Sequence, residues 1–584
     1  MKRVSLYMFA FAIFSNSYAQ ESINKDVKVV SQYTPAVAEA TKISVSPQID
    51  DTTSAKPTFE YKINAKRYES EFVTQPISAA TMAKERIFYP EKTLIKFGAG
   101  TYSTIFGELY YNIYQSDKYA VGLNFEHLSS FGTLKLSNDT LVDAPHSNTN
   151  LGFSARRFIK NKTIGFDIKY NRTGVEYYGL ENINPASYYY LNSGSSDSTS
   201  GASLAEGSSQ YHSNFEAAIN LQSFAGQEKD DSYTGGFTFS NYGNKYSVGE
   251  TSIFLDGCYR HNQESMYLLG LATIDVNMLN TSTSTYPQYN YVSGNRATVT
   301  LMPRVGFIFS HMDIQVGLNI YNQTGDLDEK GFKIGPHLLA NLNLAEDIIT
   351  AYGGLSSKLN VNKYKDVAYE NYYVAPDLSV KSSFYGLRMF GGLKGNFSSK
   401  TSFLVEASYS SFTDEHFFVN KLYRTTDPTN TTMTQLFDYS NRFDVVYDDG
   451  KLLNLIGEFV VKPTDNLDFI LFGSYNQYNL SYQPQAWHKP QLEFGLKSTI
   501  RPLEGLIINA NVTSIGKRYA FDPTTLDEKT LKQALDISIN GEYHYNQRWM
   551  FFGGIYNLIA SDYYKWNEYP THGINVRAGL GIKF

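Results

Sequence analysis

The stretch "GINVRAGLGIKF", residues 573–584, decides the fold class. Its even-numbered residues, from Ile574 to Phe584, are apolar, and the residues between them are polar or glycine. This alternation has the period of a β-strand whose two faces meet different surroundings. We therefore expect a strand with its even-numbered side chains in lipid and its odd-numbered side chains in a polar interior.

The same pattern recurs through most of the chain. Alternating segments include "YAVGLNFE" (119–126), "IGFDIKY" (164–170) and "FLVEASY" (403–409). The composition agrees, since Tyr (47) and Phe (38) are abundant, Gly is common (43) and charged residues make up only 18% of the chain. Aromatic-rich, charge-poor sequences favour strands over amphipathic helices, so the prediction is an all-β protein.

The links between these segments are of two kinds. Short polar links, such as "QSDK" (115–118) and "PTDN" (463–466), alternate with longer ones such as residues 180–209. Short turns on one rim and long loops on the other are typical of a transmembrane antiparallel β-barrel. Counting two strands per short turn predicts about 22 strands, within a range of about 16 to 22. An unpaired strand edge in lipid costs several kcal/mol per group, so the closing strand should pair with the first strand, residues 93–100.

The N-terminal part predicts three segments. Residues 1–19 carry Lys2 and Arg3 before a short apolar run, the pattern of a secretory signal peptide. Residues 20–90 are rich in Pro and Ser and predict an extended arm in the periplasm or a piece lying in the lumen. Residues 91–584 form the predicted barrel, which we expect in the cell outer membrane of a Gram-negative bacterium.

Other functional classes find little support in the sequence. No metal-binding His motif, nucleophile elbow or phosphate-binding Gly-Lys loop occurs, so we predict no enzyme activity, no catalytic or metal-ligating residue and no cofactor. The formal net charge is −6 without a strongly basic block, which argues against nucleic-acid binding. The single cysteine, Cys258, is expected to be a packing residue.

Polar residues on the inner face of predicted strands are the candidates for function. They would set solute selectivity, or they would only solvate the wall and pair across strands. Aromatic residues in the long links, including Trp487 and Trp566, are interpreted as rim anchors, with ligand capture as the alternative. The predicted lumen-facing polar residues are Arg388, Lys394, Glu406, Asp536, Glu542 and Arg577.

Two stretches resemble a known family. The end "YNLIASDYYKWNEYPTHGINVRAGLGIKF" (556–584) resembles the final hairpin of TonB-dependent receptor barrels, and "VKVVSQYTPAVAEATKISVSPQIDDT" (27–52) is similar to the N-terminal region of Bacteroidetes-type members. The resemblance implies a 22-strand barrel that binds or passes a solute across the outer membrane. A full plug domain is longer than the segment before residue 91, so we expect a barrel without a complete plug.

The resemblance also suggests partners. "DVKVVSQ" (26–32) is similar to the segment that TonB binds by strand addition, which makes Val27, Val29 and Val30 a candidate TonB contact. An ordinary extended tether is the alternative. The other expected partners are outer-membrane lipid and the barrel-assembly machinery. The competing functional hypothesis is a non-transporting structural or assembly subunit that docks other envelope proteins.

Deletion of Phe584 should impair insertion of the barrel. The final strand resembles the C-terminal signal by which the barrel-assembly machinery recognises its clients, a signal that would comprise Val576, Leu580, Ile582 and Phe584. The measurement is the amount of folded protein in outer-membrane fractions of cells that express the full and shortened chains. Equal amounts would refute the assembly signal.

Overall fold

The structure is a computed structural model. It describes residues 92–584 except 137–138, 140, 180–208, 224–230, 282–290, 328–329, 346–347, 426–435, 523–526 and 562, and it gives only the backbone of 422–425 and 436–440. The predicted segments 1–19 and 20–90, with Val27, Val29 and Val30, lie outside the described residues.

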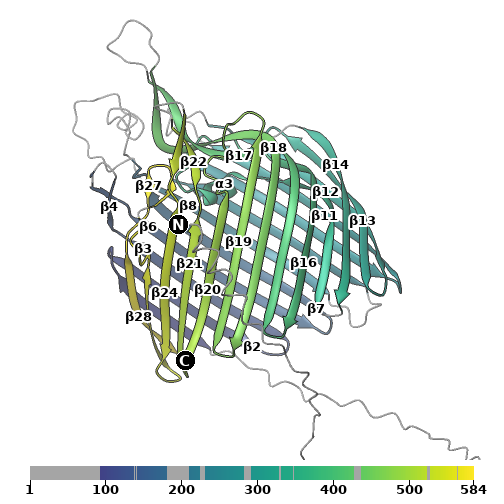
Figure 1. Ribbon diagram of the computed structural model, residues 1–584, viewed down its shortest axis with the longest axis horizontal. Coiled ribbons are helices and arrows are strands. Elements are labelled where there is room, and N and C mark those ends of the chain that lie inside the picture. Colours follow the sequence, from purple (N-terminus) through teal and green to yellow (C-terminus); the bar gives the residue numbers. More distant parts are fainter. Residues whose placement is uncertain are drawn as a thin grey trace, which may run out of the picture. The chain divides into compact units, whose positions relative to one another are not determined.

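The described residues form a closed antiparallel barrel of 22 strands (Figure 1). Closure comes from β1, which pairs with β2 on one side and with the last strand, β28, on the other. The barrel strands are β1 (Thr93–Gly100), β2 (Thr104–Gln115), β3 (Tyr119–Ser130), β6 (His146–Ile159), β7 (Lys162–Glu176), β8 (Ser209–Ser223), β9 (Ser232–Asn244), β10 (Val248–Asn262), β11 (Met266–Thr281), β12 (Gly294–Ile308), β13 (Met312–Gly325), β14 (Gly331–Ala345), β15 (Ile349–Asn360), β16 (Ser383–Ser398), β17 (Thr401–Thr425), β18 (Leu436–Thr464), β19 (Leu467–Leu480), β20 (Leu492–Leu503), β21 (Leu506–Ile515), β24 (Ala534–His544), β25 (Trp549–Tyr556) and β28 (Asn575–Lys583).

The remaining elements are short and lie in the connections at one end of the barrel. They are the hairpins β4 (Thr133–Lys135) with β5 (Leu141–Asp143), β22 (Arg518–Asp522) with β23 (Asp527–Leu531) and β26 (Tyr564–Trp566) with β27 (Tyr569–Pro570), and the helix α3 (Tyr364–Glu370). We call this end the loop end and the opposite one the turn end. No helix among the described residues is long and apolar enough to cross a bilayer.

The predicted fold class and strand number are confirmed. The predicted first strand coincides with β1, and β28 lies within the predicted closing stretch and pairs with it from Leu94↔Lys583 to Gly100↔Arg577. The expectation that all short links lie on one rim was too simple. The loop end also has tight links, at 101–103 and 245–247. Positive φ angles at Tyr102 (56°), Ser103 (47°) and Ser247 (61°) let the chain reverse there in three residues.

Alternation along the strands separates an apolar outer face from a polar inner face. In β28, Val576 is 41% exposed on the outside, whereas its neighbour Asn575 is buried. Leu387, Met389 and Leu393 are likewise exposed on the outside of β16, and Arg388 lies between them. An apolar outer band with a polar interior is the pattern of a barrel that stands in lipid.

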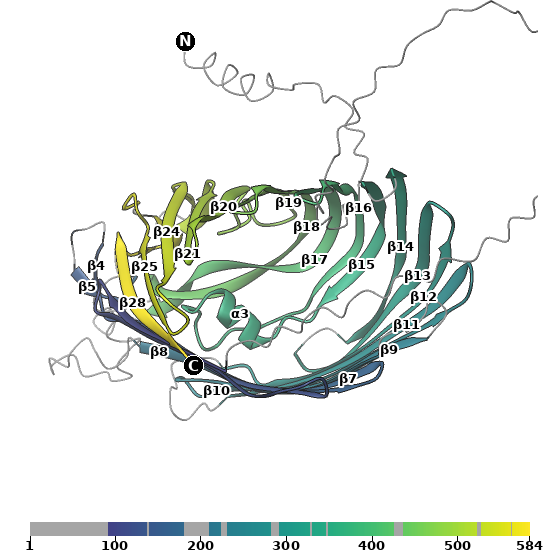
Figure 2. The ribbon, with the colours of Figure 1, turned by 90° about the horizontal axis from the view of Figure 1, so that it is seen from below.

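The largest apolar core lies in the connections at the loop end. The connection between β15 and β16, residues 361–382, is here called the inward loop; it contains α3 and folds inside the ring of strands (Figure 2). Trp487 (1% exposed) and Trp566 (8%) are buried at this end, so their interpretation as rim anchors was wrong. The buried cluster consists of Tyr242, Val248, Leu279, Tyr364, Val367, Ala368, Val374, Leu378, Val380, Phe418, Phe443, Trp566 and Tyr569.

Candidate functional site

A polar row crosses the inner wall beside the seam where the barrel closes. Lys96, Glu108 and Glu126 lie on the strand face opposite Phe97, Ile105 and Phe125, which are exposed on the outside. Strand register places these three polar residues, and then Asn150 and Asn171, directly opposite one another on β1, β2, β3, β6 and β7. The row is continued by a hydrogen bond from the Asn171 amide to Asn150 Oδ1 (2.7 Å).

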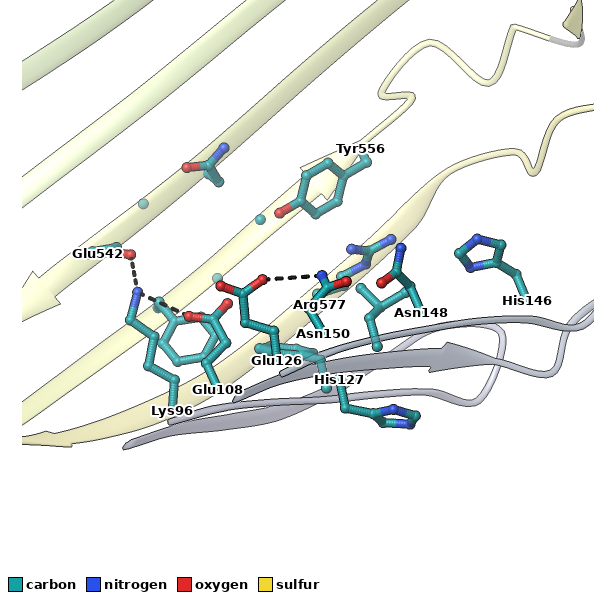
Figure 3. A pocket seen from close by; sticks show the side chains of 17 residues that line it. Lys96, Glu108, Glu126, His127, His146, Asn148, Asn150, Glu542, Tyr556 and Arg577 are labelled. Carbon is teal, nitrogen blue, oxygen red and sulfur yellow. Dashed lines mark hydrogen bonds and ion pairs between the residues drawn. The ribbon is translucent and has the colours of Figure 1, made fainter. Parts of the chain in front are cut away.

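Lys96, Glu108, Glu126 and Asn150 line a hollow of about 420 Å3 that we call the seam pocket (Figure 3). Lys96 Nζ lies 2.9 Å from Glu542 Oε1 and 3.8 Å from Glu108 Oε2. Glu126 accepts a hydrogen bond from Tyr110 Oη (2.6 Å) and one from the Asn150 amide (3.5 Å). The pocket thus joins side chains from the first strands of the barrel to side chains from the last ones.

Arg577 forms the cationic wall of the same pocket. Its Nε donates to Asn575 Oδ1 (3.0 Å), and its guanidinium lies over the Tyr556 ring, 4.6 Å from the centroid. Among the described residues, Arg577 makes no ion pair with a carboxylate. His127 points away from the charged groups in Figure 3, and its Nδ1 is 2.8 Å from Thr149 Oγ1.

The six predicted lumen residues fall at different places on the wall. Glu542 and Arg577 both line the seam pocket. Arg388 and Glu406 form an ion pair between β16 and β17, and Glu406 also accepts from Tyr352 Oη (2.9 Å). The two remaining residues make other contacts. Lys394 lies 5.4 Å from the centroid of the Tyr352 ring, and Asp536 accepts from Tyr563 Oη (3.3 Å).

Sequence reasoning missed Lys96, Glu108 and Glu126. The signal that could have found Lys96 was present, because it is the polar residue between Ile95 and Phe97 in the predicted first strand. Alternation alone does not give the stagger between neighbouring strands. Only the register shows that the three charges stand side by side.

The inward loop is attached to the wall of β9 to β12. The Glu250 carboxylate accepts the backbone N–H groups of Tyr364 (2.8 Å) and Lys365 (2.9 Å) at the start of α3. Lys363 Nζ lies 3.0 Å from Asp275 Oδ1, and Lys365 Nζ donates to Ser240 Oγ (2.9 Å). Charge-assisted contacts of this kind hold a backbone segment in one place.

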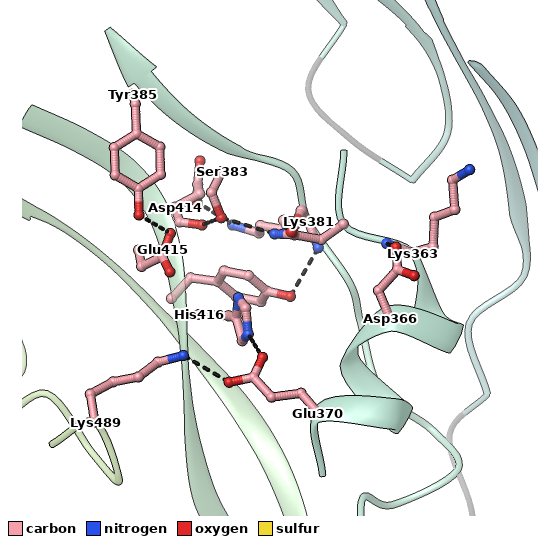
Figure 4. Close-up of polar contacts among 12 residues, drawn as sticks. Lys363, Asp366, Glu370, Lys381, Ser383, Tyr385, Asp414, Glu415, His416 and Lys489 are labelled. Atoms are coloured by element: carbon pink, nitrogen blue, oxygen red, sulfur yellow. Dashed lines mark hydrogen bonds and ion pairs between the residues drawn. The ribbon is translucent and has the colours of Figure 1, made fainter. Parts of the chain in front are cut away.

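The other side of the inward loop is attached to β17, β18 and the connection 481–491 (Figure 4). Glu370 lies 2.8 Å from His416 Nε2 and 2.8 Å from Lys489 Nζ. Burial alone would raise the pKa of Glu370, but the hydrogen bond with His416 and the charge of Lys489 outweigh burial and lower its pKa to about 2. Its carboxylate is therefore ionised at neutral pH.

Backbone contacts complete this second attachment. The Ala375 N–H donates to the Phe443 carbonyl (2.8 Å), and the Phe443 N–H donates to the Tyr373 carbonyl (2.9 Å). Lys421 Nζ also contacts Asp377 Oδ1 at 2.7 Å. Since its two attachments are on different parts of the ring, the inward loop crosses the lumen at the loop end (Figure 2).

His488, in the connection 481–491, contacts strand β17 and the connection between β25 and β28. Its Nδ1 lies 2.9 Å from the Phe418 carbonyl, and its Nε2 accepts the Asn567 N–H (3.1 Å), so the ring is a neutral Nδ1–H tautomer. Burial lowers the pKa of His488 to about 3, although the hydrogen bond to Phe418 acts in the opposite direction. His488 has a φ of 62°, a backbone conformation that Asn tolerates well.

Comparison with known proteins defines the fold further. No protein-family model matches the chain, and no curated protein matches its sequence. Among solved structures, the ferric-catecholate import receptor Fiu of E. coli K12 aligns with a TM-score of 0.58 at 10% identity, covering 85% of this chain and 82% of its own. This is the fold of outer-membrane receptor barrels.

Two further structures give the same result. The siderophore receptor PirA from Acinetobacter baumannii has a TM-score of 0.60 at 10% identity, covering 86% of this chain and 81% of its own. The FrpB iron transporter from Neisseria meningitidis has a TM-score of 0.62 at 8% identity, covering 85% of this chain and 82% of its own.

Among the described residues, no group of three or more His, Cys, Asp or Glu side chains is placed to hold a metal ion.

Acidification should loosen the connections that His488 joins. Between its ordinary pKa of 6.5 and its lowered pKa of about 3, only the opened form takes up a proton, so stability falls as pH falls. At about 1.4 kcal/mol per pH unit, local opening becomes about tenfold more frequent on going from about pH 7.5 to about pH 5.5.

Hydrogen exchange at the Asn567 amide, corrected for the intrinsic effect of pH, measures this opening. The His488→Asn variant keeps a side chain that tolerates the positive φ but removes the titrating ring. Its opening should depend less on pH than that of the natural chain. The same pH dependence in both chains would contradict the assigned role of His488.

Proposed function

We propose that this chain is an outer-membrane β-barrel that binds a solute and passes it across the outer membrane, without covalent chemistry. The observation that carries the proposal is the closed 22-strand barrel, apolar outside and lined inside by charged and amide side chains. The likeness to Fiu, PirA and FrpB supports it, since these are an import receptor, a siderophore receptor and an iron transporter.

The inward loop is proposed as the barrier of this barrel on the loop-end side. It crosses the lumen between the β9–β12 wall and the β17–β18 wall and is held there by ionic contacts at both ends. A lumen as wide as that of a 22-strand barrel needs an element inside it to limit leakage. Residues 20–90 are the second candidate barrier, as a periplasmic arm or a piece in the lumen.

Replacement of residues 364–380 by a short Gly-Ser linker should raise the conductance of the barrel in planar bilayers. The reason is that the linker lacks α3 and the groups that bind Glu250 and His416. The same linker in place of residues 133–143, the β4–β5 hairpin, is the matched control and should leave conductance low. Absence of conductance and solute flux from the natural chain, the linker variant and a chain lacking residues 20–90 would remove the support for transport.

Energy coupling through TonB forms part of the proposal. Similarity of residues 26–32 to the TonB-binding segment of Bacteroidetes-type receptors supports Val27, Val29 and Val30 as the contact. Photocrosslinkers at these three positions should give a TonB adduct in cells, and one at Ser46 should not. If no adduct forms where an authentic receptor reacts, TonB dependence is lost while passive passage stands.

Three further assignments belong to this proposal. Residues 1–19 direct export, residues 91–584 form the barrel, and Val576, Leu580, Ile582 and Phe584 form the signal for the barrel-assembly machinery. The structure places Phe584 at the barrel seam, where its backbone N–H donates to the Thr93 carbonyl (3.0 Å). This position suits a signal that is read as the barrel closes.

A docking function is the second candidate. The observation in its favour is the length of β17 (25 residues) and β18 (29 residues), which carries their hairpin beyond the other strands at the loop end (Figure 1). Such a hairpin could bind a partner protein through its backbone N–H and C=O groups. Recovery of a stoichiometric envelope protein with the purified chain, together with absence of flux, would favour docking over transport.

A further inference from the structure

The acidic side of the seam pocket holds more carboxylates than cations. Glu108 and Glu126 stand directly opposite each other on β2 and β3, an arrangement that destabilises a sheet when both are charged. Lys96 is shared between Glu108 and Glu542, at 3.8 and 2.9 Å. Glu126 accepts hydrogen bonds from two neutral donors, Tyr110 and Asn150. A cationic group from a ligand would relieve this excess of negative charge.

Arg577, in the same pocket, is a cation without a carboxylate partner among the described residues. It is half-buried, and its described partners are the Asn575 amide oxygen and the Tyr556 ring. Along β28, Arg577 lies four residues before Gly581, which pairs with Lys96. Four strand residues span about 13 Å along the wall, and Glu108 and Glu126 lie two and three strands from β28, so the backbones are about 16 to 19 Å apart. Among the described residues no ion pair joins the Arg577 guanidinium to these carboxylates.

The space between the two charged ends suits a peptide backbone. Asn148 and Asn540 line it, and Asn148 Oδ1 has no hydrogen-bond partner among the described residues. Amide side chains offer donors and acceptors of the kind that peptide groups pair with.

We propose that the seam pocket binds a short zwitterionic peptide, with its ammonium between Glu108 and Glu126 and its carboxylate on Arg577. The Arg577 and Glu side chains reach into this gap from both ends, and an extended chain of three to four residues, at about 3.3 to 3.6 Å per residue, spans the remaining about 10 to 14 Å. A purely anionic solute would meet the three carboxylates, and a purely cationic one would leave Arg577 without a counter-charge. The proposal names the solute class of the proposed transport function and rests on it.

Calorimetric titration of the full chain in detergent with tetraalanine tests the proposal. N-acetyl-tetraalanine, which lacks the ammonium, and tetraalanine amide, which lacks the carboxylate, should each bind about tenfold more weakly, equivalent to the loss of one charge-assisted contact. Glu126→Gln should abolish discrimination against the acetylated peptide alone. Arg577→Met should abolish discrimination against the amide alone.

The matched control is Asp465→Asn, a change at an exposed turn that pairs with Lys400 at the turn end. It should leave all three titrations unchanged, and heat-modifiable migration on gels checks that every variant is folded. Equal binding of the three peptides, or binding of none, overturns the proposal. Flux in bilayers is measured separately: flux without tetraalanine binding rejects the peptide site alone, whereas binding without flux rejects the transport function alone.

Discussion

Pairing of the first strand with the last is the constraint on which the rest of the structure depends. In an apolar surrounding each unpaired backbone N–H or C=O costs several kcal/mol, so an open edge on β1 or β28 would outweigh the marginal stability of a folded chain. Glycine at the contact between the two strands allows their backbones to approach closely enough to pair. A Cβ on Gly579 would lie 2.3 Å from the Phe97 carbonyl, and one on Gly98 would lie 2.4 Å from the Ala578 carbonyl. Larger side chains there would hold the two strands apart.

Closure also creates the candidate site. Lys96 and Glu542 are 446 positions apart in the chain, yet they form an ion pair because β1 and β28 complete the ring. The seam pocket therefore exists only in the closed barrel. Its charges can remain in the wall because the interior is polar, whereas the same charges facing lipid would cost about 2 to 4 kcal/mol each near the bilayer centre.

A ring of this many strands cannot fill its interior with side chains from the wall, which explains the inward loop. Its centre packs apolar side chains such as Val367 and Phe443, and its two ends are held by ionic groups, Lys363 with Asp275 and Glu370 with Lys489. Removing one member of the buried Lys363–Asp275 pair leaves a charge unpaired, which costs far more than the pair itself contributes. The position of the loop is thus specific, since few other placements would pair all these groups at once.

The limits of sequence reasoning follow from the same physics. Period-two alternation and short polar turns are local signals, so they were enough to predict the barrel, β1 and the closing strand, and to place Glu542 and Arg577 among the candidate inner-wall residues. Stagger between strands is not local, and the row of Lys96, Glu108 and Glu126 could not be predicted without it.

The position of the inward loop is harder still to predict from sequence, because its partners come from distant strands. Glu250 lies 114 positions from the Tyr364 N–H that it accepts, and His416 lies 46 positions from Glu370. Nothing in the alternation of β10 or β17 distinguishes these residues from the other polar side chains of the inner wall. Trp566 shows the same limit. As an aromatic residue in a long connection it was predicted to anchor the rim, but its contacts with Phe418 and Phe443 bury it. In a barrel, periodicity predicts which face a residue takes, and only the register and the folded connections decide which charges on that face meet.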